Sequence, residues 1–291
     1  LLRGSLWFQV VKLARLTIFV EDSLFRCDAA PGFIPSVIGS IDELKAAGGF
    51  LFVVATSAGR LGDVNVTTLN STIVVEAPAD DATSRNAVAF VFSTTVPGQS
   101  IDNVVVTFHR SRVTANALNR SAAAISHLLS IVGFEKVENY EVHFHNATLA
   151  AATSLVTSSA STILGRSRFM YNRASVSRAV VAVHDGSIIT VDSGKACAAG
   201  AFWLTFDGAL RNVRVTLDGG SMIRVTSPID VEVFVGQALA TAPSQINVSY
   251  VFDEGSTVEV VSRENSEKVL TQISTGDAVA HIVDGYRFAL L

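Results

Sequence analysis

Short runs in which hydrophobic and polar residues alternate recur along most of this chain. In each copy, a run such as Val104, Val106 and Phe108 leads to a polar residue, a turn and a second run rich in β-branched residues. Alternation with a period of two is typical of a β-strand with one buried face. The copies begin at Ala14, Gly62, Asp102, Glu138, Ser177, Arg211, Gln245 and Asp277. The pattern predicts a repeated strand–turn–strand unit.

The polar residue that ends the first strand of each unit sets the period of the repeat. In the seven copies that can be aligned at this position, the residue is Asn70, His109, His145, His184, Asp218, Asp253 and Asp284 in turn. Neighbouring copies are separated by as few as 31 residues (Asp253 to Asp284) and as many as 39 (Asn70 to His109). Further apolar runs lie between the copies, at residues 87–92, 201–206, 231–235 and 269–273. Each repeat is therefore predicted to hold about three strands, the number in one coil of a parallel β-helix.

These features predict an all-β fold: a right-handed parallel β-helix, or solenoid, of about seven to eight coils, with residues 1–291 forming a single domain. Right-handedness is expected because parallel crossover connections are overwhelmingly right-handed. The alternative fold is a β-propeller. The period is short for a propeller blade, and neither Gly-His nor Trp-Asp recurs, so the β-helix is favoured.

One segment interrupts the strand pattern. Residues 27–49 are predicted to be an insertion between the first coil and the rest, because prolines and glycines precede a helical stretch at Ser40–Ala47. Ser40 is a suitable N-cap for that short helix. Residues 120–129 are a second helix candidate.

The composition is consistent with a large buried core. The chain is 49% hydrophobic and 16% charged, and its mean hydropathy is +0.41. No stretch has both the length and the apolarity of a membrane helix, so the apolar residues are expected in many short strands. The net charge is −4 and no basic stripe occurs, so nucleic acid is not an expected partner. The sequence leaves open whether Cys27 and Cys197 pair.

The polar column offers one candidate metal site. His109, His145 and His184 would lie in three successive coils about 4.8 Å apart, and imidazoles are ligands for zinc or copper. The favoured interpretation is a ladder of polar turn residues, since His, Asp and Asn all suit a tight bend. We therefore expect no bound metal and no cofactor. His143 and His145 should point to one face of their strand, with Phe144 facing inward.

Five sequons are candidate N-glycosylation sites, at Asn65, Asn70, Asn119, Asn146 and Asn247. Several of them lie in or next to the repeat strand, where an outward side chain has room for a sugar.

No catalytic motif accompanies the repeat. Polysaccharide lyases and hydrolases on β-helices need clustered acids, often with calcium or a basic residue. The one Asp-Asp pair, Asp80 and Asp81, lies in a turn-like segment, and no nucleophile elbow or phosphate-binding loop occurs. We expect a non-enzymatic protein with no catalytic residue; the alternatives are a carbohydrate-active β-helix enzyme and a purely structural spacer.

The repeat texture resembles a known family. The segment from Arg211 to Ser227, residues 102–108 and the spacers rich in Ala, Val, Ser and Thr are similar to the dispersed gene family proteins of trypanosomatid parasites. The resemblance covers most of the chain from Gly62 onward. It implies a fragment of a larger cell-surface glycoprotein with a β-helical ectodomain, anchored in the membrane outside this segment. It also implies adhesion to host matrix proteins or glycans, and offers no catalytic residues.

Overall fold

The computed structural model is built of parallel β-sheets. It describes residues 2–3, 6–10, 15–28, 47–48, 50–55, 60–77, 86–94, 99–119, 124–132, 134–155, 165–172, 175–193, 197–205, 210–227, 231–236, 245–253, 255–262 and 288–290. Within these residues every strand pairing is parallel, and no helix occurs. None of them belongs to a helix long and apolar enough to cross a membrane. The described part is therefore all-β, as predicted, and is compatible with a solenoid.

The strands form three sheets. Sheet A contains β1 (Leu2–Arg3), β4 (Leu24–Asp28), β8 (Thr72–Ala77), β11 (Arg112–Asn119), β14 (Thr148–Leu155), β17 (Ile188–Ser193), β20 (Met222–Ser227), β23 (Thr257–Ser262) and β24 (Phe288–Leu290). Sheet B contains β2 (Leu6–Val10), β6 (Leu51–Ala55), β9 (Asn86–Thr94), β12 (Ala124–Val132), β15 (Gly165–Asn172), β18 (Cys197–Thr205) and β21 (Val231–Gly236), and β5 (Ala47–Gly48) also pairs with β9. Sheet C contains β3 (Leu16–Glu21), β7 (Arg60–Leu69), β10 (Ser100–His109), β13 (Lys136–His145), β16 (Ser175–His184), β19 (Leu210–Leu217) and β22 (Gln245–Phe252).

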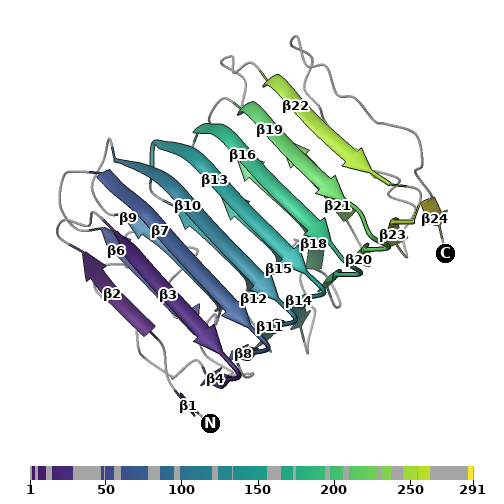
Figure 1. Ribbon diagram of the computed structural model, residues 1–291. Helices are drawn as coiled ribbons and strands as arrows, with labels where there is room; N and C mark the ends of the chain where they lie inside the picture. The colour runs from purple at the N-terminus through teal and green to yellow at the C-terminus, as the bar shows by residue number, and fades with distance from the viewer. Residues whose placement is uncertain are drawn as a thin grey trace.

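The chain visits the three sheets in a fixed order. From β2 to β23, leaving aside the short β5, successive strands belong to sheets B, C and A in turn, which defines seven repeats of three strands in the described residues. Each strand pairs with the corresponding strand of the repeats before and after it, so β10 lies between β7 and β13. Figure 1 shows the sheet C strands side by side along the stack, from β3 to β22. The prediction of three strands per repeat is confirmed.

Inward side chains of successive repeats lie in columns. In β10 the alternating residues Val104, Val106 and Phe108 are 0%, 0% and 3% exposed. Val106 is in register with Val66 on one side and Val142 on the other, and both of these are also fully buried. Burying one such side chain stabilises the fold by about 1.5–3 kcal/mol, and each repeat needs its neighbours to complete that burial.

A chain of phenylalanines runs through the core. Ring centroids are separated by 4.8 Å from Phe25 to Phe50, 5.5 Å from Phe50 to Phe90, 5.4 Å from Phe90 to Phe108 and 5.1 Å from Phe108 to Phe144. The first three contacts are edge-to-face and the last is stacked. Both arrangements are favourable for aromatic rings, so these contacts stabilise the stacking of repeats.

Two predictions about local structure are wrong. The predicted helix at residues 120–129 is contradicted because residues 124–132 form β12, which pairs with β9 and β15 on its two sides. Sheet pairing on both sides satisfies the backbone and overrides a modest local helix preference. The predicted insertion begins too early, because Cys27 lies in β4 and pairs with Val75 of β8.

Other predicted features fall largely outside the described residues. These are the Asp80-Asp81 pair, the run at 269–273, Asp284 and most of the helix at Ser40–Ala47. Ala47, the last residue of that predicted helix, lies in β5.

Candidate functional site: the turns from sheet C to sheet A

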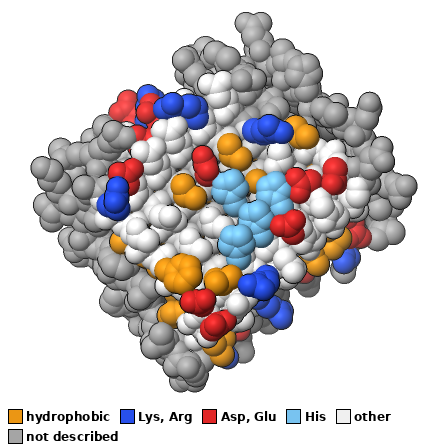
Figure 2. All heavy atoms as spheres, viewed as in Figure 1, with side chains coloured by type: hydrophobic (Ala, Val, Ile, Leu, Met, Phe, Trp, Pro, Cys, Tyr) orange, Lys and Arg blue, Asp and Glu red, His pale blue; other side chains and the backbone are white. Residues whose placement is uncertain are grey.

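Four of the six histidines gather on the outer face of sheet C (Figure 2). His109, His145 and His184 end strands β10, β13 and β16, where they are in register with one another. His143 lies two residues before His145 on the same outward face, while Phe144 between them is fully buried. The predicted column of three histidines and the predicted direction of Phe144 are confirmed.

The column differs from the prediction in one place. His109 is in register with Leu69, whereas Asn70 is one residue further along. Asn70 instead belongs to a second column of residues in the left-handed backbone region, with φ values of 47° at Asp22, 48° at Asn70, 45° at Arg110, 48° at Asn146 and 58° at Asp185. Asn and Asp tolerate this region better than other residues with side chains, which explains most of the column.

The imidazole rings lie nearly parallel to one another along the repeats. Ring centroids are separated by 4.6 Å for His109 and His145, with an interplanar angle of 12°. The corresponding values are 5.2 Å and 25° for His145 and His184. His143 and His145, on one strand, are 6.4 Å apart. The separations of the column follow from the spacing of strands in a sheet.

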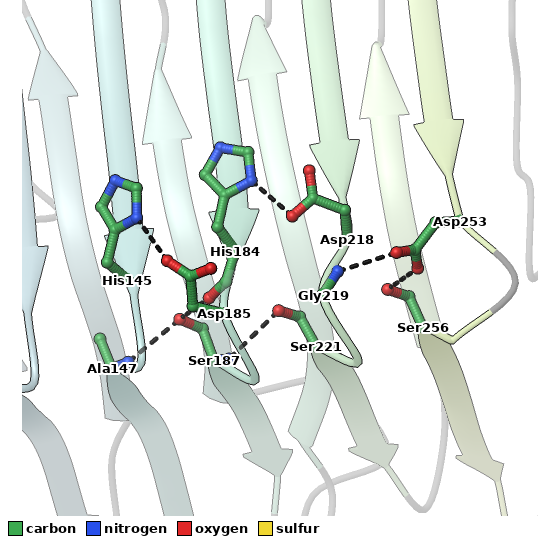
Figure 3. Close-up of polar contacts among 10 residues, drawn as sticks. All are labelled: His145, Ala147, His184, Asp185, Ser187, Asp218, Gly219, Ser221, Asp253 and Ser256. Atoms are coloured by element: carbon green, nitrogen blue, oxygen red, sulfur yellow. Dashed lines mark hydrogen bonds and ion pairs between the residues drawn. The ribbon is translucent and has the colours of Figure 1, made fainter.

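Two of the histidines bond to carboxylates of the following repeat. His145 Nδ1 lies 2.9 Å from Asp185 Oδ2, and His184 Nδ1 lies 2.6 Å from Asp218 Oδ1 (Figure 3). His143 Nε2 lies 3.1 Å from Glu141 Oε2 on its own strand. The polar groups are therefore linked one after another along the stack.

The surroundings of His109 disfavour its charged form. Partial burial lowers the pKa of His109 below its ordinary value, and the neighbouring His145 and Arg110 lower it further. Asp185 acts in the opposite direction, but its effect is smaller. His109 is therefore harder to protonate than an isolated histidine.

A ladder of serines, all of them buried except Ser23, lies directly behind these turns. Its members are Ser23, Ser71, Ser111, Ser187, Ser221 and Ser256, with Ala147 in the fourth repeat. The backbone N–H of Ala147 donates to Ser187 Oγ at 3.0 Å, and that of Ser187 donates to Ser221 Oγ at 3.1 Å (Figure 3). The Ser187 hydroxyl donates in turn to the carbonyl of His184 at 2.6 Å. These bonds connect successive turns and satisfy buried backbone groups.

The sequence carried a signal for this ladder, since a serine follows the polar residue within three positions in five of the seven aligned copies. The sequence interpretation missed that the hydroxyl of such a serine accepts a hydrogen bond from the preceding repeat, as Ser187 does from the Ala147 N–H.

A second polar ladder lies at the start of the sheet C strands. Asn103 Nδ2 donates to Asp63 Oδ1 at 2.9 Å, and Asn139 Nδ2 donates to Asn103 Oδ1 at 3.0 Å and to Asp102 Oδ1 at 2.8 Å. Asp63, Asn103 and Asn139 have φ values near 50°, as do Arg178 and Asn212 at the same place in later repeats (φ 51, 50, 49, 59 and 51). Sequence reasoning missed this bend, because it interrupts strands that otherwise alternate without a break.

The structure does not bring the candidate metal ligands to a common point. Among the described residues, no group of three or more His, Cys, Asp and Glu side chains is arranged to hold a metal ion. The rings of His109, His145 and His184 are nearly parallel, so the lone pairs in their planes do not converge on one point. Three such rings cannot ligate one ion as they stand, and the polar turn ladder accounts for their positions.

The sequons differ in their surroundings. Asn65, Asn70 and Asn146 are exposed, and the last two occupy the left-handed turn column. Asn65 Oδ1 accepts a hydrogen bond from Thr67 at 3.3 Å. Asn119 ends β11 and Asn247 lies in β22, but their side chains are outside the described part.

The two cysteines are too far apart to pair. Cys27 is buried in the first repeat, in β4, while Cys197 begins β18 of the sixth repeat. At about 4.8 Å per strand, a separation of at least four strands along the stack exceeds the reach of a disulfide.

Comparisons with known proteins gave no relative: no family, no curated protein and no solved structure matches this chain.

Proposed function

We propose that the chain is a closed, right-handed parallel β-helix that serves as a non-enzymatic surface for binding or display. The constant order of sheets B, C and A, with parallel pairing throughout the described strands, supports the closed helix. Right-handedness follows from the preference of parallel crossovers. An electron-density map of the purified chain that traced a left-handed or open path would contradict this fold.

One observation carries the non-enzymatic function. Three carboxylates at the turns from sheet C to sheet A bond to groups of the preceding repeat: Asp185 to His145, Asp218 to His184, and Asp253 to the Gly219 amide. A glycosidase needs two carboxyl groups facing one substrate across about 5–10 Å, and a lyase needs a base beside a charge-stabilising group. These carboxylates instead form hydrogen bonds that link neighbouring repeats.

The proposed role is adhesion or display at a cell surface, with host matrix proteins or glycans as partners. The exposed sequons at Asn65, Asn70 and Asn146 support a glycoprotein, and the repeat texture that resembles trypanosomatid dispersed gene family proteins supports a membrane-anchored parent protein. The sheet C face offers a flat, mixed-charge surface for such contacts (Figure 2).

The test uses the chain secreted from a eukaryotic host and offered to panels of matrix proteins and glycans. Reversing the charges of Glu141 and Arg214, which are exposed on sheet C, is expected to abolish binding. Reversing the charge of Arg224, which is exposed on sheet A, should leave binding unchanged. Failure across the panels would leave the structural spacer as the better proposal. Release of reducing ends or unsaturated sugars from polysaccharides would favour the enzyme alternative.

A further inference from the structure

The carboxylates next to the histidine column fix the tautomer of two rings. An ionised carboxylate only accepts hydrogen bonds, so Nδ1 of His145 must donate its proton to Asp185, and Nδ1 of His184 must donate to Asp218. In the neutral imidazole the other nitrogen, Nε2, then carries a lone pair. This carboxylate–histidine arrangement is the one that orients metal-binding histidines in proteins.

The two Nε2 atoms are accessible and point the same way. Figure 3 shows the rings of His145 and His184 side by side, each with its second nitrogen directed away from the turn. The two side chains are 32% and 25% exposed, and neither Nε2 has a hydrogen-bond partner among the described residues.

The spacing of the two rings shows how far they must move to share one ion. The ring centroids are 5.2 Å apart, whereas two metal–nitrogen bonds of about 2.1 Å at a tetrahedral angle place the nitrogens about 3.4 Å apart. Binding one ion therefore requires both partly exposed side chains to rotate, so that the Nε2 atoms approach each other and their lone pairs converge.

We propose that His145 and His184 together bind a divalent transition-metal ion, Zn²⁺ or Cu²⁺, through their Nε2 atoms, with water at the remaining positions. This is a two-ligand surface site and needs no third protein side chain. Asp185 and Asp218 act as positioning residues that hold the rings and strengthen the nitrogens as ligands.

The charge distribution favours this pair over His109. Asp185, Asp218 and Asp253 follow one another on the side of the column toward the later repeats, while Arg110 adjoins His109 on the other side. Hydrogen bonds from Ser256 and the backbone lower the pKa of Asp253, which keeps that carboxylate negative. A cation is therefore attracted to the His145–His184 end.

The first experiment is calorimetric titration of the metal-free chain with Zn²⁺, Cu²⁺ and Mg²⁺. Zn²⁺ and Cu²⁺ are expected to bind and Mg²⁺ is not, because imidazole suits the first two. His145→Ala and His184→Ala should each weaken binding at least about tenfold, and Asp218→Asn about tenfold. His127→Ala, in β12 of sheet B, is the matched control and should bind like the wild type. The proposal would be overturned if neither Zn²⁺ nor Cu²⁺ bound at concentrations up to about 1 mM, or if both histidine variants bound them as tightly as the wild type does.

A second experiment needs no variant. Nitrogen-15 NMR of the metal-free chain should show His145 and His184 as Nδ1–H tautomers, and Zn²⁺ should shift their Nε2 signals but not that of His127. Nε2–H tautomers, or Zn²⁺ shifts centred elsewhere, would contradict the site. Because neither experiment depends on a binding partner, their failure is distinguishable from failure of the adhesion role.

Discussion

The turns from sheet C to sheet A are built in two ways in the early and the late repeats. In the first four repeats a single residue with positive φ makes the turn, and its N–H donates to the next repeat, as Arg110 does to the His145 carbonyl at 2.9 Å. From the fifth repeat onward two residues separate the polar residue (His184, Asp218 or Asp253) from the serine. These turns close on themselves, since the Ser187 N–H donates to the His184 carbonyl at 3.1 Å and that of Ser221 to Asp218 at 3.2 Å.

The difference concerns where the backbone groups find their partners. An early turn depends on its neighbour for its backbone bond and tolerates Asp, Asn or Arg at the one special position. A late turn supplies its own bond, but the fifth and sixth have positive φ at both central residues, with glycine at three of those four positions (φ 58 and 71, then 63 and 72). Turns of that kind favour Asp-Gly and Gly-Gly. The late turns are thus locally specified, and the early ones are specified by stacking.

The largest expected effect is at Gly219. An added Cβ would lie 2.8 Å from the backbone nitrogen of Asp185, and φ is +63°. Gly219→Ala should lower the free energy of unfolding by about 3 kcal/mol, from backbone strain plus the clash. Gly220→Ala is the control: φ is similar at +72°, but the nearest atom is 3.9 Å away, so the loss should be about 1–2 kcal/mol. Equal losses in denaturant unfolding would contradict the clash.

Removing one serine tests whether the ladder links the two kinds of turn. Ser187→Ala leaves the buried Ala147 N–H without its acceptor, and should cost about 2 kcal/mol in the free energy of unfolding. Ser177→Ala, at a partly exposed position of β16, should change it by less than about 0.5 kcal/mol. A Ser187→Ala protein as stable as the Ser177→Ala protein would show that the ladder contributes nothing.

Glycine at an early turn should make it resemble a late one. Arg110 has φ 45° and is exposed, so Arg110→Gly should raise the unfolding free energy by about 1 kcal/mol. Arg112→Gly, two residues further on in β11, should lower it by about the same amount. Thermal or urea unfolding that moves both variants in the same direction would refute the role of the turn column.

The gap in the serine ladder offers a smaller gain. Ala147 stands in a ladder position and is 1% exposed. Ala147→Ser would place a hydroxyl opposite the Ser111 N–H and should add about 0.5–1 kcal/mol to stability, measured by urea unfolding. Destabilisation instead would mean that this turn has no space for the hydroxyl.

The smallest effect concerns pH. Because the folded-state pKa of His109 is lowered below 6.5, protonation favours the unfolded chain. The contribution of this histidine to stability is complete above its ordinary pKa and is lost as the pH falls from there through the folded-state value. His109→Gln should therefore lose less stability than the wild type between pH 7.5 and about 5. Identical unfolding midpoints for the two proteins across that range would contradict the shift.

The sequence by itself determined the strands and the number of strands in each repeat. Alternation such as that of Val104, Val106 and Phe108 depends only on which side of a strand faces the core, so it is visible locally. It also identified the outward direction of His143 and His145, but among the described residues of the polar column that it predicted, only Asn70 has a positive φ.

Only the tertiary structure decided the register between repeats. A one-residue shift placed Asn70 in the left-handed column and Leu69 beside His109, and such shifts leave no trace in a single strand. The His145–Asp185 bond and the serine bonds join residues 34 to 40 positions apart. Their partners depend on how neighbouring repeats stack, because no single repeat buries its inner face or satisfies its turn alone.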